Sequence, residues 1–303
     1  MSLTPTNPQE TKDDKRISPD DGLFAVLDES ELEFFSDQTG IKDGDELKKH
    51  ILEIRAEAWK IHPYHCIRVF AFARFKLNRF PAYKDLLKLG KERPGALFLD
   101  LGCCLGHDVR KAVADGFPIN QAIGSDLHSE FWDIGHKLFK TTPETFPLAF
   151  IPADIFDPAS LAPAPLPTSV PTDPLPPLTT LTSLNPLRGR LSAIHASALF
   201  HLFTEEKQLE LAKLIAPLLS PEPGSFIFGA HGGLPVKGER ERVNSHGIHM
   251  FCHSPETWKE LWEKQVFPEG QVRVDAFLLD RKIWRPDGGE RKEPALVWTV
   301  TRL

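Results

Sequence analysis

The stretch from Leu97 to Asp108, which reads LFLDLGCCLGHD, has the residue types and spacing of a ligand-binding turn. Four of the five residues 97–101 are apolar, which suits a strand buried on both faces of a parallel sheet. Gly102 and Gly106 then flank a tight turn that leads into the helical pattern VRKAVADGF. Glycine lets the backbone turn sharply and approach a ligand with no Cβ in the way. We therefore expect a strand, a turn and a helix around a cofactor pocket.

The spacing inside this turn narrows the class of cofactor. A dinucleotide site would read GxGxxG and place its helix N-terminus against a pyrophosphate. The turn here reads DxGxxxG, which disfavours a nicotinamide-dependent reductase, and it lacks the Gly-Lys-Ser/Thr of a phosphate-binding loop. The turn resembles motif I of the class I S-adenosylmethionine (SAM) methyltransferases, whose ligand carries no phosphate. That resemblance implies SAM contacts from Asp100, Gly102, Cys103 and Gly106.

A second acidic residue stands at the end of the next expected strand. Residues 122–125 predict a short strand, and Asp126 follows about twenty residues beyond the glycine turn, the distance at which a βαβ unit delivers a carboxylate to ribose hydroxyls. A carboxylate accepts two hydrogen bonds from a vicinal diol. We expect Asp126 to bind the ribose of the cofactor, with Leu127 beside it. The alternative role for Asp126 is a helix N-cap or turn residue.

The third expected strand, in LAFIPADIFD, ends near Ala153, Asp154 and Ile155. In the methyltransferase pattern, an acidic residue at this place contacts the amino group of adenine, and apolar neighbours pack on the ring. The resemblance implies these roles for Asp154 and Ile155, and a cap or turn role is again the alternative for Asp154. Three strand ends in this order are less expected by chance than one, so we interpret them together as a SAM site.

Histidines gather where the fourth and fifth expected strands end. These ends read HASALFH at 195–201 and GAHGG at 229–233, and in open α/β sheets the ligand lies outside the carboxyl ends of the strands. His195, His201 and His231 are therefore candidate catalytic residues, and His195 would also face the cofactor. A structural, hydrogen-bonded role is the alternative for each.

These histidines leave two classes of methyl acceptor open. Methyl transfer from a sulfonium is an in-line displacement, so the enzyme must above all hold the acceptor and the methyl group in line. A carboxylate is already ionised near neutral pH and needs no base. A phenol or an alcohol would gain from a histidine that takes its proton.

A second cluster, at 244–258, contains His246, His249, Cys252 and His253. These residue types bind zinc. They crowd into eight residues with no distant pair to close a tetrahedral cage, so we expect no metal site. We expect instead a substrate loop after the fifth strand.

The remaining patterns predict the elements that position these residues. Amphipathic helical signals run through residues 21–60, where one helix has an apolar face formed by Leu47, Ile51, Ile54 and Ala58. A fourth strand is expected over 191–195, a helix capped by Thr204 follows it, and a fifth strand lies in SFIFG. The alternating segments VRVDAFLLD and PALVWTVTRL predict an antiparallel pair at the sheet edge.

A proline-rich segment separates the third and fourth expected strands. Residues 158–186 hold nine of the 27 prolines and no aromatic residue. Proline removes a backbone donor and fixes φ. We therefore expect a long exposed loop with no helix or strand and no chemistry.

Length, composition and charge limit the classes of protein to which this chain can belong. The 303 residues are 41% hydrophobic and 26% charged, as in ordinary globular proteins, and can bury a full core. The net charge of -6 argues against a nucleic-acid partner.

No apolar run is long enough to span a membrane, and residues 1–20 lack the apolar core of a signal peptide. Four cysteines without spaced pairs predict a reduced, cytoplasmic protein, and a homodimer stays open.

Together these patterns predict an α/β fold with a Rossmann-like, seven-stranded, mostly parallel sheet, a C-terminal antiparallel hairpin and an N-terminal helical cap. This is the layout of the class I methyltransferases. The expected division is a disordered leader at 1–20, a helical cap at 21–94 and a SAM-binding domain at 95–303, whose proline-rich loop spans 158–190.

Five segments resemble the fungal methyltransferases of meroterpenoid and related secondary-metabolite pathways: LFLDLGCCLGHDVRK, IGSDLHSEFWDIG, ADIFD, IHASALFHLFTEEKQ and PEPGSFIFGAHGG. The resemblance runs from about His62 to the C-terminus, without the proline-rich loop. It implies SAM-dependent O-methylation of a small lipophilic acid, at a carboxyl group or, in some members, at a hydroxyl. A phenol, alcohol or amine methyltransferase is one alternative, and a non-catalytic SAM-binding regulator is another.

Such a substrate would occupy an apolar pocket with a few polar anchors. An arginine can bind a carboxylate through two parallel hydrogen bonds. Aromatic residues can line the pocket, although they are more often part of the core. The candidate substrate-binding residues are Arg68, Arg74, Phe200, His231, His246, Met250, Phe251 and Trp258.

Overall fold

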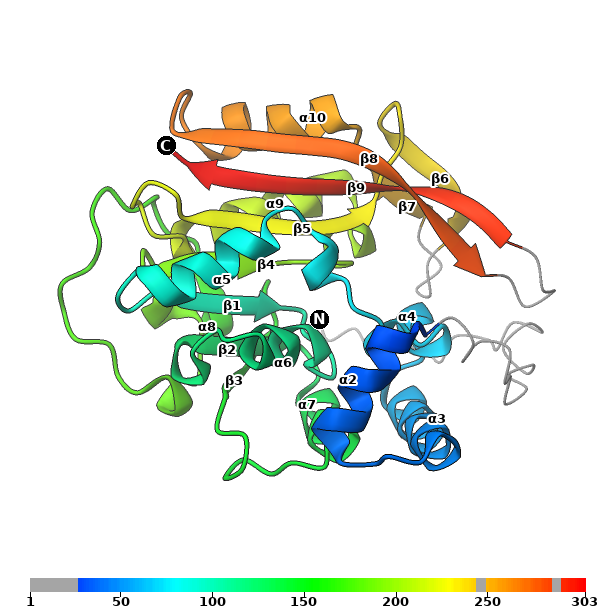
Figure 1. Ribbon diagram of the computed structural model, residues 1–303. Coiled ribbons are helices and arrows are strands. Elements are labelled where there is room, and N and C mark those ends of the chain that lie inside the picture. Colours follow the sequence, from blue (N-terminus) through cyan, green and yellow to red (C-terminus); the bar gives the residue numbers. More distant parts are fainter. Residues whose placement is uncertain (1–26, 244–248, 285–289) are drawn as a thin grey trace, which may run out of the picture.

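One sheet of seven strands, in the order β3-β2-β1-β4-β5-β9-β8, forms the centre of the molecule (Figure 1). The computed structural model describes residues 27–243, 249–284 and 290–303, so the expected leader at 1–20 and His246 lie outside it. The strands of the sheet are β1 (Leu97–Leu101), β2 (Ala122–Asp126), β3 (Ala149–Pro152), β4 (Leu191–His195), β5 (Phe226–Gly232), β8 (Val272–Trp284) and β9 (Glu290–Arg302). The predicted seven-stranded α/β fold is confirmed. None of the helices in the described ranges has the length and apolar character needed to cross a membrane.

Strand directions and order define where a ligand can bind. Strands β1 to β5 run parallel to one another, and β9 is antiparallel to both β5 and β8. The predicted C-terminal hairpin is confirmed, although β9 lies inside the sheet and only β8 forms its edge. The chain runs outward from β1 to β3 and then returns to β4 on the other side of β1. The carboxyl ends of β1 and β4 are therefore the switch point at which open α/β sheets bind ligands.

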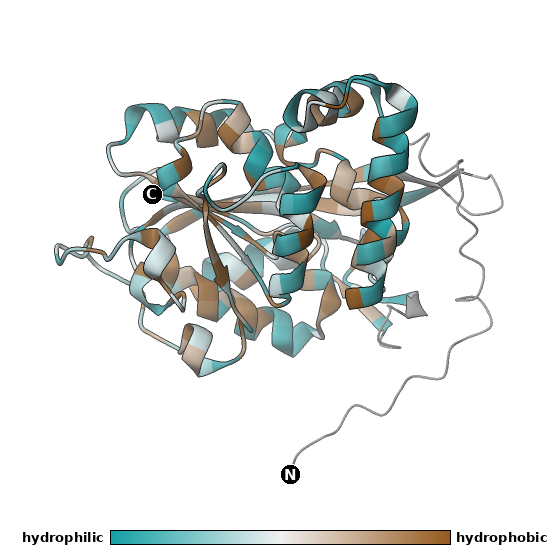
Figure 2. Cartoon of the chain, turned by 90° about the horizontal axis from the view of Figure 1, so that it is seen from below, coloured by the Kyte–Doolittle hydropathy of each residue, from teal (hydrophilic) through white to brown (hydrophobic). Residues whose placement is uncertain are grey.

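Two layers of helices cover the sheet. One layer comprises α5 (Tyr83–Glu92), α6 (His107–Ala114) and α7 (Ser129–Leu138). The other comprises α9 (Glu205–Ile215), α10 (Pro255–Glu260) and the π-helical segment η8 (Leu261–Val266). Phe98 packs in the first layer and Leu99 in the second, because successive strand residues point to opposite faces. Figure 2 shows that the helices carry both hydrophilic and hydrophobic residues, as expected between a sheet and water.

The N-terminal cap packs largely on α7. Its helices are α2 (Glu29–Thr39), α3 (Gly44–Ile61), α4 (His65–Arg68), η1 (Ala71–Ala73) and η2 (Leu77–Arg79). The predicted apolar face of α3 is confirmed, since Leu47, Ile51, Ile54 and Ala58 are buried and share a core with α7. The cap lies beyond the arrowhead of β1 (Figure 1), and its core includes Leu105 from the turn after that strand.

The proline-rich segment departs from the expectation of an exposed loop without helices. It contains the short helices α8 (Pro158–Leu161), η4 (Leu178–Thr180) and η5 (Asn185–Leu187). Asp157 caps α8 by accepting a hydrogen bond from Ala159 N at 2.9 Å, and Pro158 at the first helical position costs no hydrogen bond. The leucines between the prolines supply apolar surface, and four of them are buried in the core that contains α9: Leu161, Leu181, Leu184 and Leu187.

A small hairpin replaces part of the expected substrate loop. Strand β7 (His249–Cys252) pairs antiparallel with β6 (Gly238–Val243). Gln208 Nε2 on α9 donates to the backbone oxygen of Phe251 at 3.0 Å, which fixes the hairpin to the main body. The loop prediction was wrong for these residues because alternation over so few positions does not distinguish a strand.

Candidate functional site

The turn after β1 holds a left-handed backbone conformation. Gly102 and Gly106 have φ of 71° and 75°, and Cys104 between them has φ of 52°. A Cβ at Gly106 would lie 2.5 Å from Cζ3 of Trp132, so a larger residue at this position would force the Trp132 ring or the turn to move. Gly102 N donates to Ser125 O at 2.8 Å, which ties the turn to β2. The predicted strand, turn and helix are confirmed, and α6 begins directly after Gly106.

Asp126 ends β2 and faces this turn. Its Oδ2 accepts a hydrogen bond from Cys104 N at 2.8 Å, and its Oδ1 accepts one from His128 N at 3.1 Å. Each carboxylate oxygen keeps capacity for another hydrogen bond. Burial raises the pKa of Asp126, and these two backbone donors oppose that rise. The N-cap of α7 is His128, so Asp126 orders a turn without capping that helix, and Leu127 beside it is 55% exposed.

Asp154 and Ile155 follow β3. Asp154 is exposed, and its Oδ1 accepts a hydrogen bond from Phe156 N at 3.0 Å. The cap of α8 is Asp157, so Asp154 does not cap that helix. Ile155 is buried. Both residues stand at the predicted strand end, and their contact with a cofactor stays a prediction.

Strand register places Asp100 of β1 beside His195 of β4. His195 Nδ1 lies 2.8 Å from Asp100 Oδ1, and His195 Nε2 lies 2.7 Å from Ser197 Oγ. Ala230 N donates to the same serine oxygen at 3.1 Å. The side chains of His195 and Asp100 are 2% and 3% exposed, whereas Ser197 is half-buried. These residues form a continuous hydrogen-bonded chain from the core to the switch point.

Ser197 is a site residue that the sequence analysis missed. A histidine and a serine two positions apart in an extended segment point to the same side, and that spacing was the available signal. The rings of Phe80 and Phe228 flank the His195 ring, with centroids 5.8 and 5.1 Å away. The imidazole is thus enclosed by apolar rings except toward Asp100 and Ser197.

His231 lies in an aromatic core. Trp298 Nε1 donates to His231 Nδ1 at 3.0 Å, and the His231 ring centroid is 4.7 Å from that of Trp258 and 5.6 Å from that of Phe200. His231, Phe200 and Trp258 are each 0% exposed. Their position is that of packed core, and we do not assign them to the wall of a substrate pocket.

His201 and Met250 meet at the end of β5. His201 Nδ1 accepts a hydrogen bond from Gly232 N at 3.3 Å. A Cβ on Gly232 would lie 2.9 Å from Met250 Sδ, so the methionine packs against the strand end. Met250 and Phe251 are both half-buried. The side chains of His201 and Met250 therefore lie at the carboxyl end of β5, and their contact with a methyl acceptor stays a prediction.

The cap reaches the segment after β2 through Tyr64. The ring centroid of Tyr64 lies 6.1 Å from that of His128 and 5.9 Å from that of Phe131. Burial raises the pKa of Tyr64 to about 12, and the nearby charge of Asp126 adds to the rise. The sequence analysis did not predict this contact of Tyr64.

Arg68 and Arg74, the predicted carboxylate anchors, are both half-buried. Nε of Arg74 is buried and makes no hydrogen bond to any residue that the structure describes. The backbone next to it is fixed, because Phe75 N donates to the buried carboxylate of Glu31 at 2.9 Å. Arg74 thus offers a donor without a partner in the described part of the chain, and its contact with an anion stays a prediction.

A buried pair at the start of α6 also escaped the sequence analysis. His107 Nε2 lies 3.3 Å from Asp108 Oδ2, and Asp108 Oδ1 accepts hydrogen bonds from Lys76 N at 3.3 Å and Leu77 N at 3.2 Å. Burial lowers the pKa of His107. The pair joins the cap to α6 and interacts electrostatically with His195.

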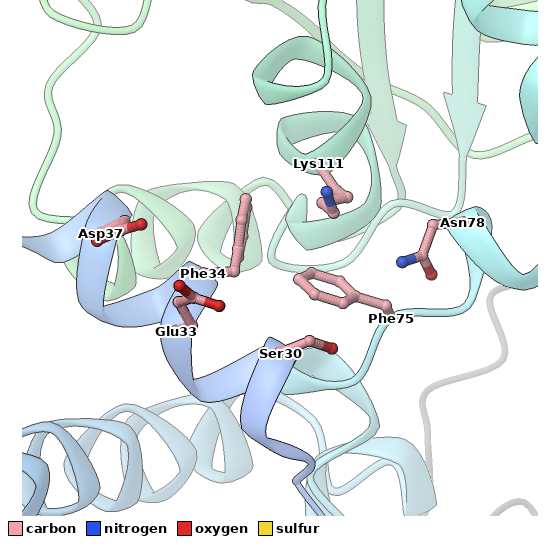
Figure 3. A pocket seen from close by; sticks show the side chains of 7 residues that line it. All are labelled: Ser30, Glu33, Phe34, Asp37, Phe75, Asn78 and Lys111. Carbon is pink, nitrogen blue, oxygen red and sulfur yellow. The ribbon is translucent and has the colours of Figure 1, made fainter.

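Two surface hollows lie away from these residues. One of about 280 Å³ lies between α2 and α6, where Phe34 and Phe75 face each other with ring centroids 4.9 Å apart and Lys111 stands nearby (Figure 3). Another of about 390 Å³ lies at the amino end of β5, beside Gly224 and Phe226. Neither hollow is lined by a predicted cofactor or substrate residue. The candidate site is therefore defined by the residues at the carboxyl ends of the strands.

The side chains that could bind a metal do not assemble. Within residues 27–243, 249–284 and 290–303, no group of three or more His, Cys, Asp or Glu side chains could hold a metal ion. His253 Nδ1 instead pairs with Thr257 Oγ1 at 3.0 Å. His249 is exposed and Cys252 is buried.

The strand order and the glycine turn after β1 define a Rossmann-like α/β protein of the class I methyltransferase architecture. Residues 22–73 match a family model described as the meroterpenoid methyltransferase N-terminal domain. The chain belongs to the fungal secondary-metabolite methyltransferases, as its similarity to individual relatives shows.

Two relatives illustrate the similarity. The O-methyltransferase phiE of a fungal species (strain ATCC 74256) is 33% identical over 236 residues, which cover 77% of this chain and 70% of that protein. The asnovolin E/chermesin D methyltransferase nvfJ of Aspergillus novofumigatus is 33% identical over 231 residues, covering 76% and 71%. A solved SAM-dependent methyltransferase from Mesorhizobium loti is 14% identical with a TM-score of 0.43, over 75% of this chain and 100% of that one.

Proposed function

We propose that this chain transfers the methyl group of SAM to an oxygen of a small lipophilic metabolite, and that the acceptor is a carboxylate, which becomes a methyl ester. The observation that carries the proposal is the arrangement of three features at one edge of the sheet. These are the glycine turn after β1, Asp126 after β2, and the Asp100–His195–Ser197 chain. Family membership supports the reaction, since the relative phiE is named an O-methyltransferase.

The residues around the glycine turn fit SAM. The oxygens of Asp126 each retain an acceptor direction, which suits the vicinal hydroxyls of a ribose. Leu127 exposes apolar surface beside them and Ile155 lies at the next strand end, which suits a purine ring. The exposed carboxylate of Asp154 can accept from an adenine amino group. When bound, SAM supplies an electrophilic methyl group on a sulfonium.

A carboxylate acceptor requires positioning more than proton removal. It is ionised near neutral pH, so its oxygen is already a nucleophile. The transfer removes its negative charge together with the positive charge of the sulfonium, and an apolar surrounding favours such a neutralisation. Arg74 offers an unpartnered donor for the second carboxylate oxygen, and Met250 and Phe251 offer apolar surface.

A hydroxyl acceptor is the second candidate, and one observation favours it. The Asp100–His195–Ser197 chain could take a proton from a phenol or alcohol, with His195 as the base and Asp100 orienting its ring. A non-catalytic SAM-binding protein would bind SAM without methylating either class of acceptor.

Incubation with methyl-labelled SAM and matched acceptors tests the proposal. Para-octylbenzoic acid and abietic acid represent aryl and terpenoid acids, and para-octylphenol and abietinol are the corresponding hydroxyl compounds. We expect the label in the acids. Label in the hydroxyl compounds alone would favour the second candidate, and SAM binding by calorimetry without any transfer would indicate a non-catalytic protein.

We also infer that the protein works in the cytoplasm. All four cysteines are free thiols, and proteins of that reducing compartment rarely form disulfides.

A further inference from the structure

We propose that Ser197 contacts the acceptor, and that its hydroxyl donates a hydrogen bond to the acceptor carboxylate when His195 carries a proton on both ring nitrogens. Binding of the acceptor then takes up one proton. The inference rests on the proposed function, because it requires a carboxylate acceptor. It adds a residue that selects for that acceptor.

While His195 is neutral, the hydrogen bonds of Ser197 fix the direction of its hydroxyl hydrogen. A serine hydroxyl has one hydrogen and two lone pairs. If His195 Nδ1 donates to Asp100 Oδ1, then Nε2 must accept, and the serine hydrogen points inward to it. Ala230 N–H occupies one lone pair of the serine oxygen. Only a lone pair remains for a ligand, and a lone pair repels a carboxylate.

A second proton on His195 reverses the orientation of the hydroxyl. Nε2–H then donates to Ser197 Oγ, while Ala230 N–H donates to the other lone pair. Both lone pairs are used, so the serine hydrogen must point away from His195. Ser197 is half-buried at the end of β4, and that hydrogen is then available to a carboxylate oxygen at the switch point.

The charges around His195 support the doubly protonated ring in the acceptor complex. Asp100 Oδ1 lies 2.8 Å from the ring, and its Oδ2 is buried with no hydrogen-bond partner in the described part of the chain. A positive ring compensates this buried carboxylate. On α6, the negative charge of Asp108 also favours a positive His195 ring, whereas His107, when protonated, disfavours it. An acceptor carboxylate at Ser197 adds a negative charge at the open end of the chain.

The remaining sides of His195 carry no charge. Phe80, which follows η2, and Phe228 on β5 present aromatic rings to it. The polar partners of the His195 ring are therefore Asp100 and Ser197.

The segment after β4 packs against the glycine turn through Leu199, two residues beyond Ser197. A Cβ at Gly102 would lie 3.5 Å from Cδ1 of Leu199, so the segment after β4 lies against the turn. A Cβ at Gly229 would come within 2.2 Å of Ala196 O, so β5 packs closely on this segment from the other side. Ser197 therefore has little freedom to move away from the proposed methyl donor.

Steady-state methylation of the octylbenzoic acid tests the donor role. We compare the wild type with Ser197→Ala, Ser197→Thr and a control, Ser192→Ala, a serine on β4. Ser197→Ala should raise KM for the acid by about ten- to a hundredfold with little change in kcat, because a hydrogen bond to a charged group is lost. Ser197→Thr retains a hydroxyl and should restore KM, and Ser192→Ala should match the wild type.

The pH dependence separates this role from a merely structural one. In the wild type, KM for the acid should rise with pH, by up to about tenfold per pH unit, because the donating orientation of the Ser197 hydroxyl needs the doubly protonated ring. In Ser197→Ala it should stay flat, since the acceptor no longer senses the ring. A structural role would lower the melting temperature and kcat and leave the pH profile of KM unchanged.

The outcomes distinguish the inference from the proposed function. If the acid is methylated and Ser197→Ala keeps the wild-type KM and pH profile, the inference is overturned and the proposed function stands. If only the hydroxyl compounds are methylated, both fail. Should Ser197→Ala not fold, Ser197→Cys carries the same expectation, because a thiol has a similar shape and donates weakly.

Discussion

At the scale of single residues, Asp126 orders a turn with its carboxylate and keeps acceptor capacity for a ligand. One oxygen holds the Cys104 N–H of the glycine turn, and the other holds the N–H of His128. Neither bond uses the full acceptor capacity of the carboxylate. The sequence predicts an acid here from its distance to the glycines, whereas the two backbone donors become visible only when β1 and β2 pair.

Replacing Asp126 with Ala should weaken SAM binding by about 1–3 kcal/mol, because the ribose hydroxyls lose a charged acceptor. Isothermal titration calorimetry measures the change. Asp133→Ala, an exposed acid on α7, is the matched control and should bind SAM as the wild type does. Equal affinity in Asp126→Ala and the wild type would show that the acid serves the turn alone.

His253 should make the fold sensitive to acid. Its side chain is 3% exposed, and burial lowers its pKa from the ordinary 6.5 to about 4. His253 binds a proton at a higher pH in the unfolded chain than in the folded one. The contribution of neutral His253 to the free energy of unfolding is therefore complete above pH 6.5 and is lost as pH falls toward about 4. The loss should reach about 3 kcal/mol.

Urea unfolding at several pH values measures this effect. The free energy of unfolding should fall less steeply with acid in His253→Asn than in the wild type, because the variant has no ring to protonate. His249→Asn, an exposed histidine on β7, should follow the wild type. Parallel acid profiles for His253→Asn and the wild type would rule out this contribution.

At the scale of elements, the unit from β1 through the glycine turn to α6 is local in sequence. Its apolar run, its two glycines and its helical pattern are contiguous, so the sequence predicts all three parts. The partner of Asp100 is different, because His195 reaches it only through the register of β1 against β4. No local pattern contains that register, and Ser197 was missed for the same reason.

Gly106→Ala should destabilise the protein by about 2–4 kcal/mol and weaken SAM binding. The new Cβ would meet Trp132 at 2.5 Å, in addition to the cost of a left-handed alanine. Gly95→Ala is the matched control, because Gly95 has φ of 70° with nothing within 4 Å of a Cβ, and it should cost only about 1 kcal/mol. Similar thermal unfolding of the two variants would contradict the steric argument.

At the scale of the whole molecule, the cap shares a core with α7, and each helix layer shares a core with the sheet. The cap core includes residues of α7 and the turn after β1, so the cap should not unfold separately. The sequence predicts the strands along the chain and the apolar face of α3, because their apolar patterns are contiguous in the sequence. It does not predict that Leu181 and Leu184 are buried, since the burial of a loop depends on the surface against which it packs. It also does not predict the short β6–β7 hairpin.

Ile51→Ala on α3 should lower the stability of the whole protein by about 2–5 kcal/mol, because Ile51 is fully buried in the core shared with α7. Circular dichroism and tryptophan fluorescence during denaturation should report one coincident transition. Glu53→Ala, exposed on the same helix, should leave stability within about 0.5 kcal/mol. Separate transitions for cap and sheet would contradict a shared core.

The central claim is that the chain methylates a carboxylate with SAM, and the alkali lability of the transferred label tests it most directly. Methyl esters hydrolyse in mild alkali, whereas methyl ethers do not. After incubation with methyl-labelled SAM and an acceptor that carries both a carboxyl and a phenol group, such as an alkylated hydroxybenzoic acid, we predict that alkali releases the label as methanol. An alkali-stable label on the phenol oxygen would contradict the claim.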